Sequence, residues 1–361
     1  MKSILLFLIS VAMVGFTSCS KEEMESSLPF GLPGTTIFDM AIDNNSVLYF
    51  VTGEIDKSVP HYSVMSHIPY RRYLSTKSEE TGKIKILDDR YQGGKIFFDK
   101  NNHLLTHDSK TIYRIDGRLR HTIFELPDPT PLQTSLSFIA VDNDNNIWAG
   151  GYASGLYKID DTRLNVTHYH VNNSELPSNY LKNIYIDKNN DIWIATGRSG
   201  EKQEILKISN DQWFVYDLNH SDITFPSSIW CMVTDKSGHL WIGGYDNENH
   251  SFMRFDGTHW EIVNPRNKIT NPRNDKIEIV ELMVRHLQSD GHKIYIVSEK
   301  IINATAHSSE LLTFDGLKWE KIYEVPKDDW IGDLVVDINR QVVWVWTLNK
   351  GEIFKIPIKV D

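Results

Sequence analysis

The chain has 361 residues, of which 24% are charged and 11% aromatic, and its formal net charge is −10. An acidic chain without a basic run is a poor partner for nucleic acid or anionic lipid, so both are excluded as main ligands. The length is large for one compact core but ordinary for an array of repeats.

The first 18 residues are expected to form a cleaved secretory signal, because one early lysine precedes an apolar run (residues 4–16) too short to span a bilayer. The segment FTSC, which ends at Cys19, resembles a bacterial lipoprotein box, and the following SKEE resembles the acidic tag of Bacteroidetes-type surface lipoproteins. The resemblance implies that Cys19 is lipidated, that this anchor alone holds the protein at the outer membrane, and that the protein faces the cell exterior. An ordinary signal cleaved elsewhere is the alternative.

Residues 19–35 are expected to hold the lipidated N-terminus, a linker and a candidate closing strand, although Pro29 and Pro33 weaken that strand. No later apolar stretch is long enough to cross a membrane. Once Cys19 is lipidated, Cys231 has no disulfide partner, and its apolar surroundings in IWCMV predict a buried, inert thiol.

A short phrase recurs along the chain, as NNIWAGG (residues 145–151), NNDIWIATG (189–197) and GHLWIGG (238–244). In each copy an aspartate lies six residues before the tryptophan, and the same offset locates weaker copies. The seven markers are Asp43, Asp99, Asp142, Asp187, Asp235, Ser289 and Asp337. Their spacing of 43 to 56 residues is typical of propeller blades or helical arrays.

The local pattern favours a propeller. Each copy has an apolar run, a turn rich in Asn, Asp, Gly or Ser, and a second run rich in Trp, Ile and Val, with a third and fourth run after it. We therefore predict an all-β fold, a seven-bladed β-propeller of four-stranded antiparallel blades, over residues 36–361. The repeated Trp148, Trp193 and Trp241 are interpreted as packing between blades, with a sugar-stacking platform as the alternative.

The stretch ELPSNYLKNIYIDKNNDIWIATG from Glu175 closely resembles the two-component regulator propeller repeat, and the runs beginning at Leu136 and Ser227 also match it. In that family, such repeats often form the extracytoplasmic sensor of a hybrid histidine kinase that responds to glycan fragments. This sequence shows no second propeller, sandwich domain, membrane helix or kinase, so the resemblance implies a free-standing, lipid-anchored propeller.

The candidate ligand-binding residues lie where the repeats differ. In a propeller, the loops between second and third strands and the connections between blades share one face, and here they are long and dissimilar. Their aromatic and guanidinium side chains could stack on and hydrogen-bond a sugar, although long loops commonly carry such residues. The candidates are Tyr152, Tyr180, Arg198, Trp230, Tyr245, Arg273 and Trp330.

Catalytic patterns are weak. The carboxylates expected on this face are Asp246, Glu299, Asp328 and Asp329, and a suitably spaced pair could hydrolyse a glycoside. The sequence has no HExxH, no zinc-type cluster, no phosphate loop and no GxSxG. We therefore predict a monomeric binding module without catalytic residue, metal or cofactor, for glycan fragments or for a protein partner of the glycan-uptake machinery. The alternative is a propeller-fold enzyme: a polysaccharide lyase, a glycosidase or a lyase resembling the streptogramin-inactivating propellers.

Overall fold

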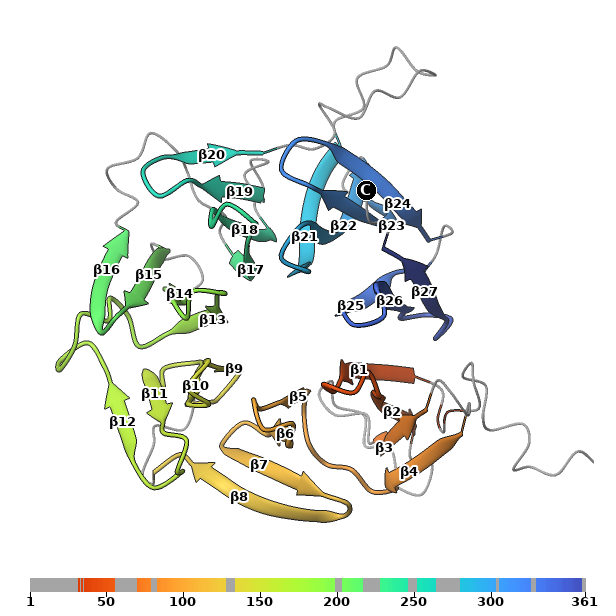
Figure 1. Cartoon of the computed structure of the whole chain (residues 1–361), viewed down its shortest axis with the longest axis horizontal. Coiled ribbons are helices and arrows are strands. Elements are labelled where there is room, and N and C mark those ends of the chain that lie inside the picture. Colours follow the sequence, from red (N-terminus) through yellow and green to blue (C-terminus); the bar gives the residue numbers. More distant parts are fainter. Residues whose placement is uncertain are drawn as a thin grey trace, which may run out of the picture.

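The predicted β-propeller is confirmed by the architecture. A computed structural model describes residues 32, 34, 36–55, 70–78, 83–127, 134–198, 203–216, 228–245, 252–263, 280–302, 305–325 and 329–358. Seven antiparallel sheets stand around a central axis, in the order of the chain (Figure 1). Six sheets have four strands, and the seventh has three within the described residues.

Blades 1 to 4 comprise the first sixteen strands. Blade 1 has β1 (Thr36–Ile42), β2 (Leu48–Ile55), β3 (Tyr70–Lys77) and β4 (Ile84–Asp88), and blade 2 has β5 (Ile96–Phe98), β6 (Leu104–His107), β7 (Thr111–Asp116) and β8 (Leu119–Glu125). Blade 3 has β9 (Phe138–Val141), β10 (Ile147–Gly150), β11 (Leu156–Ile159) and β12 (Val166–Tyr169), and blade 4 has β13 (Leu181–Ile186), β14 (Ile192–Thr196), β15 (Glu204–Ser209) and β16 (Gln212–Tyr216).

Blades 5 to 7 complete the ring. Blade 5 has β17 (Ser228–Thr234), β18 (Leu240–Tyr245), β19 (Phe252–Phe255) and β20 (Trp260–Ile262). Blade 6 has β21 (Val280–Ser289), β22 (Ile294–Ile302), β23 (Thr305–Phe314) and β24 (Trp319–Glu324), and blade 7 has β25 (Ile331–Asp337), β26 (Val342–Thr347) and β27 (Ile353–Pro357). The first strand of each blade is innermost (Figure 1). We call the face with the first-to-second strand turns the turn face, and the opposite one the loop face.

The six-residue offset between aspartate and tryptophan has a direct explanation in hydrogen bonds. In blade 4, Oδ1 of Asp187 accepts the backbone N–H groups of Asn189 (2.8 Å) and Asp191 (3.0 Å), which closes the turn between β13 and β14. Its Oδ2 accepts the indole N–H of Trp193 at 3.1 Å. Asp142 and Asp235 bind Trp148 and Trp241 in the same way. The offset is therefore the reach of one carboxylate across a turn.

The three repeated tryptophans pack between blades, as predicted. Trp148, Trp193 and Trp241 are 1–4% exposed. Trp148 belongs to a cluster with Leu181 and other residues of blade 4, and Trp241 to one with Val284 and other residues of blade 6. Burying apolar surface of this size between sheets is the main stabilising contribution that each blade receives from its neighbour.

In blade 6 the turn aspartate is not the residue that the repeat spacing predicts. Ser289 was predicted as the marker there, but Asp290 has this role: its Oδ1 accepts the N–H groups of His292 (2.8 Å) and Lys293 (2.7 Å), and its Oδ2 accepts the Tyr295 hydroxyl (2.8 Å). The turn is one residue shorter than in blades 1 to 5, so the fixed offset selected the wrong residue.

Neighbouring blades are also joined on the turn face. Three asparagines have left-handed backbone (φ 64–67°): Asn102, Asn145 and Asn190. The side-chain oxygen of each accepts a backbone N–H from the turn of the preceding blade. The donors are Asn44, Lys100 and Asn143, at 2.7–2.9 Å. Asparagine adopts left-handed backbone more readily than most residues, which suits it to this position.

Three hydrogen bonds join blades 7 and 1 at the turn face, and in each of them a side chain is the donor. Ser46 donates its hydroxyl to Asp337 (2.8 Å), Arg340 donates to the Ser46 carbonyl (2.7 Å), and Asn339 donates to the Asn44 carbonyl (3.1 Å). The candidate closing strand, within residues 19–35, lies almost wholly outside the described residues. Leu32 is described, and it is fully buried in a cluster shared by blades 7 and 1.

Candidate functional site

The innermost strands of five blades pair irregularly with their second strands. The register between first and second strands shifts at Phe38, Lys182, Trp230, Arg285 and Gly332, in blades 1, 4, 5, 6 and 7. Each of these residues lies five positions before the turn aspartate of its blade. A β-bulge re-aims the side chain of the extra residue, so the same position in different blades presents different chemistry around the axis.

The Trp230 cluster, formed by Trp230, Tyr245, Arg285 and Glu299, lies where blades 5 and 6 meet. The Arg285 guanidinium lies 4.4 Å from the centre of the Trp230 ring, a cation–π distance. Tyr245 lies parallel to the indole, with an interplanar angle of 8° and ring centres 6.1 Å apart, so it overlaps only the edge. Glu299 holds Arg285 by two bonds of 2.8 and 3.0 Å. Because this pairing is bidentate, the guanidinium plane is fixed over the indole.

A second group, the Tyr180 cluster, contains Tyr152, Tyr180 and Arg198 of blades 3 and 4. The two tyrosine rings meet edge to face at 4.9 Å, and the Arg198 guanidinium lies 5.7 Å from the Tyr180 ring. Tyr152 follows β10, Tyr180 precedes β13 and Arg198 follows β14, so all three belong to loop-face connections. Five of the seven predicted ligand residues are thus gathered in two clusters.

The strand β13 connects the two clusters. Asn183 donates its side-chain N–H to the Trp230 carbonyl at 2.6 Å. Its neighbour Lys182 occupies the bulge position of blade 4, and burial lowers the pKa of its amino group. The sequence therefore places a lysine, a tryptophan and an arginine at successive bulge positions of blades 4, 5 and 6.

The remaining predicted residues are not part of these clusters. Trp330 precedes β25, and its backbone N–H and carbonyl bond to Asp329 (2.8 Å) and to Leu348 (2.8 Å); no ring contact joins it to either cluster within the described residues. Arg273 and Cys19 lie outside the described residues. Cys231 is buried, as predicted, and burial raises the pKa of its thiol far above the usual range.

The carboxylates considered for catalysis are bound to protein groups where they are described. Glu299 is paired with Arg285, and Oδ1 of Asp329 accepts the N–H groups of Trp330 (2.8 Å) and Asn349 (2.9 Å). Asp246 and Asp328 lie outside the described residues. Across the described ranges, no group of three or more His, Cys, Asp or Glu side chains is placed to hold a metal ion, and no helix has the length and apolarity to cross a membrane.

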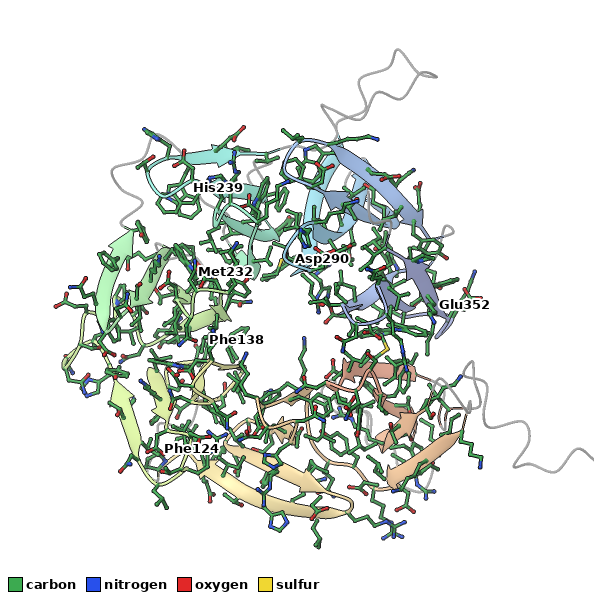
Figure 2. All side chains as sticks on the ribbon, viewed as in Figure 1. Phe124, Phe138, Met232, His239, Asp290 and Glu352 are labelled. Carbon is green, nitrogen blue, oxygen red and sulfur yellow. The ribbon has the colours of Figure 1, made fainter. Side chains whose placement is uncertain are left out.

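A network of charged residues lies on the inner strands four positions before the turn aspartates, in blades 6, 7, 1 and 2. His286 Nδ1 lies 3.0 Å from Asp333, and Lys95 Nζ lies 3.7 Å from the same carboxylate. Asp39, which is 6% exposed, accepts the Ile96 N–H at 2.6 Å. Figure 2 labels Phe138 of β9 at this position of blade 3, on the side of the blade nearest the centre of the ring. We call Asp39, Lys95, His286 and Asp333 the channel network.

The profile of the two component regulator propeller family matches residues 175–198 and 225–246. The chain is thus similar to this family over two of its repeats. The two matched segments contain Tyr180, Arg198, Trp230 and Tyr245, so each cluster has two members within them. Among curated protein sequences, none matches this chain.

Solved structures share the fold at low identity. They include the extracellular domain of a one component system from B. thetaiotaomicron (14% identity, TM-score 0.57, covering 91% of this chain and 42% of that one). An inactive variant of virginiamycin B lyase from Staphylococcus aureus, with quinupristin, has 12% identity and a TM-score of 0.58, covering 90% of this chain and 96% of that one. PorZ, a surface component of the type-IX secretion system of Porphyromonas gingivalis, has 13% identity and a TM-score of 0.59, covering 90% of this chain and 46% of that one. The chain thus spans less than half of the first and last of these proteins.

Sequence reasoning missed Arg285 and its partner Glu299 as members of one site. Arg285 lies within a strand, whereas the candidates were sought in loops. The signal was present, because Arg285 occupies the same offset from Asp290 as Trp230 does from Asp235. The misplaced marker at Ser289 hid this correspondence.

Proposed function

We propose that the loop face of blades 3 to 6 is a binding surface for glycan fragments. The Trp230 cluster carries the proposal: an indole with a parallel tyrosine at its edge and a guanidinium fixed over it by Glu299 offers both ring surface and charged donors. Sites for polar ring ligands combine apolar contact area with a few precisely held polar groups. The Tyr180 cluster extends the same chemistry to the neighbouring blades.

The propeller frame supports this use. The tryptophans that pack between blades keep the sheets in fixed positions. The residues at the register shifts differ from blade to blade, so a stiff frame can present a specific surface. The similar folds of an extracellular sensor domain and of PorZ add weight to a binding or sensing role outside the cytoplasm, although each is similar in fold alone.

The test is a panel of neutral and acidic polysaccharides and oligosaccharides, assayed with the purified protein for both retention and cleavage. We expect retention without cleavage, and Trp230→Ala should weaken binding at least tenfold, equivalent to about 1.4 kcal/mol. Trp330→Ala tests whether the binding surface also reaches blade 7, since Trp330 lies outside both clusters. Trp193→Phe is the control, because Trp193 packs between blades 4 and 5, and it should bind as the wild type does.

Each result on the panel decides between classes. Cleavage of any member would overturn the binding role in favour of the propeller enzyme. If no member of the panel is retained or cleaved, this result would favour a protein partner, such as a component of the glycan-uptake machinery, instead of a glycan.

For location, we propose a lipoprotein of the outer membrane that faces the cell exterior, anchored through Cys19. The motif FTSC and the acidic SKEE after it support this. Replacing Cys19 with Ala should abolish metabolic labelling of the protein by fatty acid, because the acylated sulfur and new amino terminus would both be lost. Undiminished labelling of this variant would contradict the proposal.

A further inference from the structure

Three blades share an arrangement of carboxylate, indole and cation near the turn face. The turn aspartate accepts the indole N–H at 2.9–3.1 Å, and a lysine or arginine of the third strand lies 5.0–5.7 Å from the centre of the indole ring. In each case the cation is paired in register with the tryptophan. The sets are Asp142, Trp148 and Lys158; Asp187, Trp193 and Lys207; and Asp235, Trp241 and Arg254.

Blade 2 keeps the carboxylate and the cation but has no aromatic ring between them. Asp99 is the turn aspartate, Leu105 occupies the tryptophan position, and Arg114 is paired in register with Leu105. Blades 1 and 6 have Tyr49 and Tyr295 at this position, and blade 7 has Trp344, paired in register with Lys355. Within the described residues, blade 2 is therefore the one that combines the aspartate and an opposed cation with an aliphatic residue.

A cavity of about 330 Å³ lies at this place, between blades 2 and 3 on the turn face. It is lined by both residues that hold an indole elsewhere, Asp99 and Arg114. Arg114 and His121 are paired across β7 and β8, and both are exposed at the cavity. Neither side chain makes a hydrogen bond, ion pair or ring contact within the described part of the chain, whereas the cations of blades 3 to 5 lie over an indole.

The carboxylate of Asp99 can accept a further donor. Its Oδ2 faces His103 Nδ1 at 3.0 Å and Arg163 Nη2 at 3.5 Å, the second a long contact. In blade 5 the corresponding oxygen of Asp235 faces His239 Nδ1 at 3.2 Å and accepts the indole N–H of Trp241 at 3.0 Å. A histidine at this position is thus compatible with an indole on the same oxygen.

From these contacts we infer that the cavity between blades 2 and 3 binds a planar aromatic ring of the indole class. The ring lies against Arg114 and donates its edge N–H to Asp99, as the protein's own indoles do in blades 3 to 5. Such a ring comes either from a free small molecule or from a tryptophan side chain of a partner polypeptide. This site is separate from the loop-face clusters, so it does not depend on their function.

The test titrates the purified protein with indole and with N-acetyltryptophanamide, using calorimetry and ligand-observed NMR. Leu105→Trp supplies the ring from the chain itself, so this variant should lose binding of both probes and melt at a higher temperature. Arg114→Gln should weaken binding about two- to fivefold, the size of an exposed cation–π contact. Lys158→Gln, which alters the cation over the indole of blade 3, is the matched control and should bind as the wild type does.

The two probes distinguish the source of the ring. Binding of N-acetyltryptophanamide at least as tight as that of indole supports a polypeptide partner, and binding of indole alone supports a free small molecule. The inference is overturned if the wild type binds neither probe saturably. It is also overturned if binding persists unchanged in Arg114→Gln, an exposed substitution that leaves the fold intact even where Leu105→Trp does not.

Discussion

Replacing Asp235 with Ala is expected to lower the free energy of unfolding by about 3–5 kcal/mol. The carboxylate accepts three bonds, from the N–H groups of Ser237 (2.9 Å) and His239 (3.0 Å) and from the indole of Trp241 (3.0 Å), and its Oδ2 faces the His239 ring at 3.2 Å. The alanine variant leaves a buried indole N–H without an acceptor, which costs more than the bond itself contributes. Urea unfolding at neutral pH measures the difference.

Asp256→Ala is the matched control, because Asp256 caps the other turn of the same blade, accepting the N–H groups of Thr258 (2.8 Å) and His259 (2.7 Å) without an indole. Asp256→Ala should lower the free energy of unfolding far less than Asp235→Ala does. Equal losses in the two variants would show that the indole bond is not the main contribution. Burial alone would raise the pKa of Asp235, but the bonds from Trp241 and His239 outweigh burial and lower it. A lowered folded pKa means that this stabilisation is present above the unfolded value near 3.9 and is lost as the pH falls through the folded pKa.

Replacing Asp39 with Asn is expected to stabilise the protein at pH 8. Burial raises the pKa of Asp39 to about 7, against the lowering effects of Lys95 and of the Ile96 N–H. The folded state therefore prefers the protonated acid, so stability is greatest below the unfolded pKa near 3.9 and falls as the pH rises to about 7. The asparagine oxygen can still accept the Ile96 N–H without a buried charge. We expect a gain on the order of 2–3 kcal/mol at pH 8 and little change at pH 4, measured by urea unfolding.

The same network supplies a control of opposite sign. Burial would raise the pKa of Asp333, but His286 and Lys95 lower it, so its charge is compensated in the folded state. Asp333→Asn should therefore destabilise the protein at neutral pH, where Asp39→Asn stabilises it. A gain in stability of Asp39→Asn that is the same at pH 4 and at pH 8 would contradict the raised pKa of Asp39.

The repeat could be predicted because its signal is local. A carboxylate that reaches two backbone N–H groups and an indole fixes the spacing of Asp187 and Trp193 in sequence, and the blade follows from that spacing. The shorter turn of blade 6 could not be predicted from a fixed offset, since Asp290 closes it with one residue fewer before Tyr295.

The site was predictable in part. Trp230 and Tyr245 were identified from the loop face, and the structure brings them together, but their contact depends on the register shift in β17. Arg285 belongs to another blade, so its position over Trp230 follows from the packing of blades, which pairing within one blade does not determine. The cavity at Arg114 lies on the turn face, where the sequence analysis placed no candidate residue.

The asparagine bonds of the turn face link each of these blades to the blade before it in the chain. Asn102, Asn145 and Asn190 each receive a donor from the blade that precedes them in the chain, so each bond can form as soon as the later blade emerges from the ribosome. The bond between Ser46 and Asp337 differs, because its two residues are separated by almost the whole propeller. Assembly can therefore proceed blade by blade during synthesis, and closure of the seam is left as the final, post-translational event.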